Sequence, residues 1–119
     1  MEVSQQEKQG ILDAIDLYVE GGRKASGKIA AEAFSPTATM SWTEDGKLKS
    51  VPIQVLFDGF DSWEPMEASY ELTTLDVAED VAMVRIESQF GPGKFADMFT
   101  LVKDGNVWKI VSKIYHVKK

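Results

Sequence analysis

Cysteine is absent from this 119-residue sequence, and histidine occurs once, at His116. Without cysteine there can be no disulfide, no thiolate metal site and no cysteine nucleophile. One histidine leaves only carboxylates as further metal ligands, and the strand pattern brings no two of these together, so we expect no metal site and no cofactor. No apolar run approaches the roughly 20 residues that a membrane helix needs, so we expect no contact with a membrane.

Positive charge is also scarce, because the formal net charge is −6. An acidic chain repels the phosphate backbone, so we expect no nucleic-acid partner and interpret the lysines near the C-terminus as solvated surface residues. The first ten residues, MEVSQQEKQG, contain no basic segment followed by an apolar run. We therefore expect no signal peptide, and together with the lack of cysteine this favours a cytoplasmic location.

The first half of the chain predicts three helices and a hairpin. Ser4 and Glu7 have the spacing of a capping box, and apolar residues at helical intervals continue to Gly21-Gly22, where we expect the first helix to end. A second helix is predicted over 23–34. Strand 38–42 and the segment after the turn at 44–46 form a predicted hairpin, and Ser50 is the predicted cap of a third, short helix.

From Ala68 onward the apolar period changes from helical spacing to two. This predicts four strands, over 68–77, 81–90, 94–103 and 107–116, joined by short turns of which Asp104-Gly105 is the clearest hairpin signal. Helices followed by an antiparallel meander predict an α+β domain with the helices packed on one face of the sheet. The length favours a single domain over 1–119.

A carboxylate lies in the middle of an apolar strand face at Asp97. If Asp104-Gly105 is a two-residue turn, Asp97 lies opposite Ser112, and the neighbouring hairpins add Ser88 and Tyr70 to a polar row on the helix-facing side. Three interpretations remain open: a satisfied buried carboxylate that fixes strand register, a carboxylate that lines a pocket, and a strand register other than the one assumed here. The sequence predicts that this acid, if the protein is catalytic, is Asp97.

The same alternation predicts what lines such a pocket and where His116 lies. The predicted lining combines aromatic residues with the polar row: Tyr18, Phe34, Trp42, Phe57, Trp63, Tyr70, Ser88, Phe99, Ser112 and His116. Four residues of strand separate His116 from the position opposite Asp97, roughly 13 Å, which argues against an Asp–His dyad and a Ser–His–Asp triad. We therefore expect His116 at the pocket rim.

The opposite sheet face is too apolar for a face covered only by solvent and too charged for a core. By parity it carries Met83, Arg85, Met98, Thr100, Val111, Lys113 and Tyr115. Mixed faces of this kind are typical of subunit interfaces, so we expect a homodimer formed through the outer face of the sheet.

Taken together the segments resemble a known superfamily. The resemblance lies in the order and spacing of Tyr18-Val19-Glu20-Gly21, AEAFSPTATM (31–40), DGKLKSVP (45–52) and ADMFTLVKDGNVWKIVSKIYH (96–116). These are similar to the nuclear-transport-factor-2-like (NTF2-like) superfamily, and within it to the SnoaL-like and "putative lumazine-binding" small bacterial proteins. The resemblance implies a cystatin-like cone, in which three helices pack on a strongly curved, six-stranded, mostly antiparallel mixed sheet around an internal pocket, and commonly a dimer.

Three functions are compatible with these observations. The first is binding of an apolar small molecule in a pocket that contains a buried carboxylate. The second is an isomerase, cyclase or dehydratase type of reaction with Asp97 as acid and base. The third is a protein-interaction module whose cavity is filled by its own side chains. Fold alone does not decide among them.

Overall fold

The computed structural model describes residues 4–119, and the first three residues of the polar N-terminal stretch lie outside the described part. The elements follow in the order α1 (Gln5–Arg23), α2 (Gly27–Ala31), β1 (Phe34–Glu44), β2 (Lys47–Pro52), α3 (Gln54–Asp61), β3 (Ala68–Ala78), β4 (Val81–Phe90), β5 (Gly93–Asp104) and β6 (Val107–Lys118).

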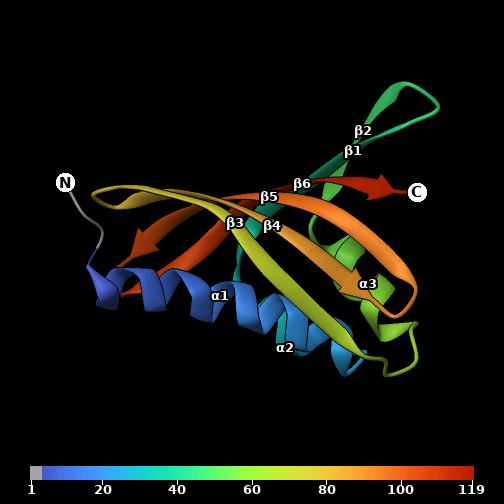
Figure 1. The fold of residues 1–119 in the computed structure, drawn as a ribbon, viewed down its shortest axis with the longest axis horizontal. Coiled ribbons are helices and arrows are strands. Elements are labelled where there is room, and N and C mark those ends of the chain that lie inside the picture. The colour runs from blue at the N-terminus through green and yellow to red at the C-terminus, as the bar shows by residue number, and fades with distance from the viewer. Residues whose placement is uncertain (1–3) are drawn as a thin grey trace.

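One sheet of six strands, in the order β2-β1-β6-β5-β4-β3, forms the body of the molecule. Strands β1 and β6 are parallel, and the other described neighbours are antiparallel. The sheet curves over α1, with α2 and α3 on the same side, while the β1–β2 hairpin projects beyond the helices (Figure 1). The predicted α+β cone with a mixed, mostly antiparallel sheet is confirmed.

Helix α1 packs its apolar side against the concave face of the sheet. Ser4 accepts a hydrogen bond from the Glu7 backbone N–H, which caps the first turn as predicted. The predicted end at Gly21-Gly22 is wrong, because α1 continues to Arg23. Gly22 instead permits a close approach, since a Cβ there would lie 2.3 Å from the Phe90 ring.

The other two helices are shorter, or begin later, than the sequence predicted. Helix α2 covers only Gly27–Ala31, and Phe34 already belongs to β1. Ser50 does not cap α3, because β2 extends to Pro52 and α3 begins at Gln54 without a side-chain cap. No helix within residues 4–119 is long and apolar enough to cross a membrane.

The four predicted C-terminal strands are present, but the registers of the last two hairpins differ from the prediction, since Ser88 lies opposite Phe95 and not opposite Asp97. Asp104 lies opposite Val107, so the turn residues are Gly105 and Asn106. Leu101 pairs with Ile110 and Thr100 with Ser112, which leaves Val111 as an unpaired bulge residue in β6. Beyond the bulge, odd-numbered rather than even-numbered residues of β6 face the helices.

Candidate functional site

An aspartate and a lysine lie together in the core of the cone. Asp97 of β5 is 0% exposed and Lys113 of β6 is 3% exposed. The distance from Lys113 Nζ to Asp97 Oδ1 is 3.6 Å. The bulge in β6 brings the lysine inward, because it places Lys113 opposite Phe99, on the face that packs against α1.

The two charged groups are only partly satisfied by hydrogen bonds. Ser88 Oγ donates a hydrogen bond to Asp97 Oδ2. Asp97 Oδ1 has no hydrogen-bond partner within residues 4–119, because 3.6 Å to Nζ exceeds the usual N–H···O length. The Met40 sulfur lies 4.0 Å from Nζ and is a weak acceptor. The amine and the free carboxylate oxygen therefore face each other without a direct hydrogen bond.

Burial shifts the pKa values of Asp97 and Lys113 in opposite directions. Loss of hydration raises the pKa of Asp97, although the Lys113 charge and the Ser88 hydrogen bond offset part of the rise. Loss of hydration lowers the pKa of Lys113, although the Asp97 charge offsets part of the fall. Both shifts favour the neutral carboxylic acid and the neutral amine. The neutral acid can donate a proton, and the neutral amine can accept a proton or attack an electrophilic carbon.

Aromatic rings surround the amine. Nζ lies 4.0 Å from the centre of the Tyr115 ring and 5.4 Å from that of Tyr18. Tyr115 stacks on Trp42 at 5.5 Å and contacts Phe95 edge-on at 6.1 Å. Burial, with the nearby Asp97 charge second, raises the pKa of Tyr18, so its hydroxyl stays protonated.

The cover over the pair is thin on one side. Tyr18 is buried, whereas Trp42, Phe95 and Tyr115 are only partly buried. Neither Asp97 nor Lys113 lines any of five clefts found on the described surface. The pair therefore lies outside these clefts, and a molecule that reaches Nζ from the partly covered side has to displace the rings of Trp42, Phe95 or Tyr115.

The structure brings some of the predicted pocket residues together and separates others. Tyr18, Phe34, Phe57 and Phe99 lie in the core, where Tyr18 contacts Phe34 and Phe99. Ser88 contacts Asp97 as predicted, although its backbone lies opposite Phe95.

Three further aromatic positions lie around this core. Trp63, in the loop after α3, packs on Phe60 and Phe90. Trp42 reaches the site by stacking on Tyr115. Tyr70 faces α1 and donates a hydrogen bond to Asp16, so it does not join Asp97.

Two predicted pocket residues lie on the other side of the sheet. Ser112 is on the outer face beside Thr100, with which it shares a hydrogen bond. His116 is exposed and lines an outer-face cleft of about 330 Å³ together with Met98 and Ile114. Their placement in the pocket was wrong, because the prediction carried the even-numbered face of β6 past the bulge at Val111.

The same bulge places two residues that were predicted for the outer face on the helix-facing side of the sheet. Lys113 is buried in the core, and the Tyr115 ring contacts Phe95 and covers the Lys113 amine, although Tyr115 also borders the outer-face cleft. Sequence reasoning therefore missed the second charged member of the site. The signal that could have found it is the adjacent apolar pair Ile110-Val111, which breaks the alternation of β6. After this pair the large aromatic residue Tyr115 falls on an odd position.

Known proteins match the chain over almost its whole length. Residues 6–116 match the family described as "Putative lumazine-binding". The chain is 31% identical over 117 residues to "Aldolase FrzH" of Cladobotryum sp, covering 96% of this chain and 94% of that protein. An NTF2-like protein of unknown function from Shewanella baltica is 36% identical, with a TM-score of 0.91 and coverage of 100% and 99%. Another from Methylobacillus flagellatus is 29% identical, with a TM-score of 0.89 and coverage of 99% and 97%.

Proposed function

Because the chain belongs to the "Putative lumazine-binding" family of the NTF2-like superfamily, we propose that its buried Asp97–Lys113 pair acts on a small carbonyl compound. The reaction we propose is of the aldol type, in which a carbon–carbon bond next to a carbonyl group is made or broken. The observation that carries the proposal is the placement of an amine and a free carboxylate oxygen 3.6 Å apart in an aromatic core.

Aldol chemistry needs a base and a group that stabilises negative charge on oxygen. The Asp97 carboxylate can remove a proton from the carbon next to a carbonyl group, or from a β-hydroxyl group in the cleavage direction. Transfer of the Asp97 proton to Lys113 would supply this carboxylate together with an ammonium group that stabilises the developing oxyanion, with little competition from water because the surroundings are apolar. The burial that perturbs both pKa values is typical of acid–base catalysts.

The comparison with known proteins supports the same reaction class. The relative from Cladobotryum that is named an aldolase has almost the same length as this chain. We therefore extend the aldol type of reaction, but not any particular substrate, to this protein. The aromatic surroundings of Lys113 favour a substrate with apolar groups next to its carbonyl.

The experiment is a cleavage assay with a fluorogenic β-hydroxyketone that releases an aromatic aldehyde. We expect turnover by the wild type and a loss of about 10²–10⁴-fold in kcat for Asp97→Asn, because the variant lacks the proton acceptor. Ser112→Ala is the matched control, since Ser112 lies on the outer face of the neighbouring strand. Equal rates for wild type and Asp97→Asn would overturn the proposal.

Binding without turnover is the second candidate, and the family description favours it. In that case the aromatic cone holds a planar heterocycle and Asp97 hydrogen-bonds to it. A thermal-shift titration with lumazine tests this, because a ligand that binds only the folded state raises the melting temperature by mass action. Saturable stabilisation by lumazine that Asp97→Asn weakens, without any cleavage activity, would favour binding over catalysis.

We also propose that two copies associate through the outer face of the sheet. Met83, Met98 and Ile114 are 56%, 45% and 48% exposed on this face. Large apolar residues that cluster on an exposed sheet face favour a protein partner. The outer-face cleft, lined by Leu48, Met98 and Ile114, offers a recess for side chains of the second copy.

A further inference from the structure

We propose that Lys113 is the nucleophile of this site and forms an imine between its Nζ atom and a carbonyl carbon of the substrate. The inference rests on the aldol-type function proposed above and gives that function a covalent mechanism. It also assigns separate tasks to the two buried groups, with Lys113 holding the substrate and Asp97 moving its protons.

The contacts of Nζ leave it free to react. A buried lysine with a purely structural role uses its N–H groups in hydrogen bonds to oxygen atoms. Within residues 4–119, the described polar neighbours of Nζ are the Met40 sulfur at 4.0 Å and Asp97 Oδ1 at 3.6 Å. Neither is a strong hydrogen bond, so the nitrogen lone pair is not committed to the scaffold once the amine is deprotonated.

The surroundings also favour the neutral amine, which is the form that attacks a carbonyl group. Nucleophilic lysines are activated by removal from water into an apolar pocket. Lys113 is 3% exposed, and burial lowers its pKa. The rings of Tyr18 and Tyr115 lie over Nζ, where they can contact a planar iminium cation by cation–π interaction.

Asp97 is placed to carry the protons of imine formation. Nζ adds to the carbonyl carbon to form a C–N bond, and the carbonyl oxygen takes the proton of the neutral Asp97 acid. Asp97 then recovers a proton from the nitrogen and returns it to the hydroxyl group, which leaves as water. The products are an iminium ion, an Asp97 carboxylate and water, whose two protons come from the Asp97 acid and from the amine nitrogen. Oδ1, which has no hydrogen-bond partner within residues 4–119, is the oxygen atom placed to pass them.

The same carboxylate serves the carbon–carbon step. It removes a proton from the carbon next to the iminium group, giving an enamine, and the enamine carbon attacks a second carbonyl carbon. The new alkoxide oxygen takes the proton back from Asp97. Water then adds to the iminium carbon and releases the product and the free amine, while the remaining proton returns to the Asp97 carboxylate; cleavage follows these steps in reverse. No oxidant or reductant is needed.

A purely structural ion pair explains the geometry less well. Buried ion pairs rarely stabilise a fold more than apolar side chains of similar volume would, and those that do have well-formed hydrogen bonds. The Asp97–Lys113 pair has a 3.6 Å contact and an unpaired carboxylate oxygen. It therefore costs stability, with only the Ser88 hydrogen bond to Asp97 to compensate.

The test uses pentane-2,4-dione, which condenses with a neutral amine, with loss of one water, to an enaminone that absorbs in the near ultraviolet. We expect saturable absorbance from the full-length wild type and one adduct per chain, mapped to Lys113 by peptide mass spectrometry. Lys113→Met should abolish this adduct, and Lys94→Met, an exposed lysine of β5, should leave it unchanged. Mapping on the wild type decides the question even if the Lys113 variant folds poorly.

The rate of adduct formation as a function of pH separates a reactive lysine from an accessible one. For Lys113 we expect the rate to rise with pH and to show its inflection below the ordinary lysine pKa of about 10.4. An inflection at the ordinary value, or adducts only on exposed lysines, would overturn the proposal.

The two proposals fail in distinguishable ways. Cleavage of the β-hydroxyketone that depends on Asp97, without any adduct on Lys113, would overturn the imine and keep the aldol-type function. An adduct on Lys113 in a protein that cleaves no β-hydroxyketone would keep the nucleophile and overturn the function. Absence of both would overturn both.

Discussion

Asp97 and Lys113 are ionisable side chains in a core otherwise built mainly from hydrocarbon and aromatic groups, and burial acts on them in opposite directions. The charge of each partner lowers the cost of ionising the other, but the 3.6 Å contact between them is too long for a normal hydrogen bond. Replacing such a pair by uncharged side chains of similar volume is often neutral or stabilising by about 1–4 kcal/mol. The pair should therefore leave a pH signature in the stability of the protein.

The stability difference between wild type and the double variant Asp97→Asn/Lys113→Met should depend on pH with a minimum. Above the ordinary aspartate pKa of about 3.9, the native state keeps a proton on Asp97 that the unfolded chain has lost, so wild-type stability falls as pH rises. Approaching the ordinary lysine pKa, the unfolded chain holds a proton that native Lys113 has lost, so stability rises with pH. Urea unfolding at pH values from 4 to 10 measures the difference.

Lys94→Met is the control for that series, because Lys94 is exposed on β5 and its loss should change stability by no more than about 0.5 kcal/mol at any pH. A wild-type curve parallel to that of the double variant across the whole range would mean that the pair does not titrate differently in the folded and unfolded states. Asp97→Asn alone should keep the alkaline rise and lose the acid fall, which assigns each arm to its residue.

At the scale of secondary-structure elements, the sequence predicted the strands well and the register less well. Alternation from Ala68 onward locates β3 to β6 because each strand has one face in the core. It also places Tyr70 opposite Ser88 correctly, whereas Ser88 lies opposite Phe95 and not opposite Asp97. A bulge changes which residues face inward while leaving composition unchanged, so the residue at Val111 shifted every later side chain of β6 to the other face.

The helix boundaries show a similar limit. Gly21-Gly22 has the composition of a helix end, but both residues are buried inside α1. The reason is tertiary, since Ala30 and Phe90 approach the helix too closely for any side chain at these two positions. Contacts between segments distant in sequence decided the outcome, and a single sequence does not contain them.

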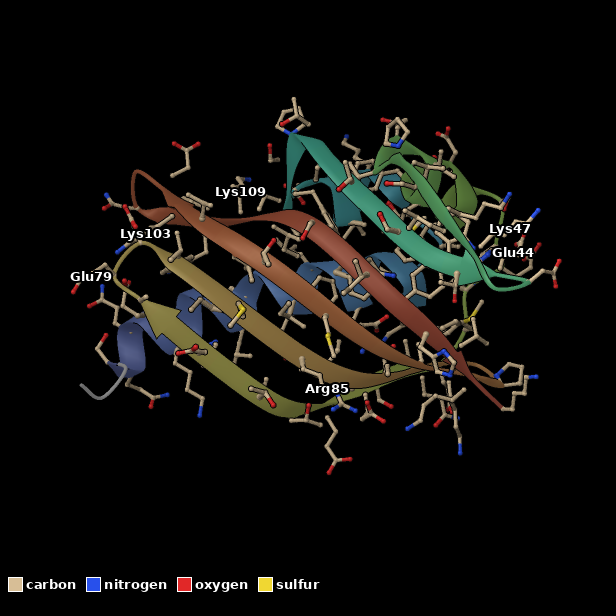
Figure 2. All side chains as sticks on the ribbon, turned by 90° about the horizontal axis from the view of Figure 1, so that it is seen from above. Glu44, Lys47, Glu79, Arg85, Lys103 and Lys109 are labelled. Carbon is tan, nitrogen blue, oxygen red and sulfur yellow. The ribbon has the colours of Figure 1, made fainter. Side chains whose placement is uncertain are left out.

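The hairpin turns provide a prediction at this scale. Glu79, labelled in Figure 2 at the β3–β4 turn, has φ +56°, a left-handed conformation that costs a non-glycine residue about 1–2 kcal/mol. Glu79→Gly should therefore stabilise the protein by about 0.5–1 kcal/mol after the entropy cost of glycine is subtracted. Urea unfolding measures the change.

Gly105 in the β5–β6 turn is the matched control with the opposite sign. It has φ +63°, and no atom lies within 4 Å of a Cβ built there, so Gly105→Ala changes only the backbone preference. We expect a loss of about 1 kcal/mol. Destabilisation by Glu79→Gly would show that interactions of the Glu79 side chain outweigh the backbone strain.

At the scale of the whole molecule, residues 4–119 leave one face of the sheet without a second layer. All three helices lie on the concave side (Figure 1), and the view from above shows the uncovered outer face with Arg85 on β4 (Figure 2). Large apolar residues on this outer face are exposed at Val81, Met83, Met98, Val102 and Ile114. Antiparallel sheets with one solvated face normally carry polar residues there, so this composition favours a covering partner.

If a second copy covers this face, one charge at its centre should separate the copies. Met98 lies on β5 within the exposed apolar group, and in a symmetric pair Met98→Glu would place a carboxylate against apolar atoms of the partner. We expect wild type to have about twice the 13.2 kDa chain mass in light scattering and Met98→Glu to have the mass of one chain. Gln6→Glu, the same charge change on the exposed part of α1, should remain a dimer. A wild type that is monomeric at all concentrations, or a Met98→Glu variant that stays dimeric, would place the interface elsewhere or remove it.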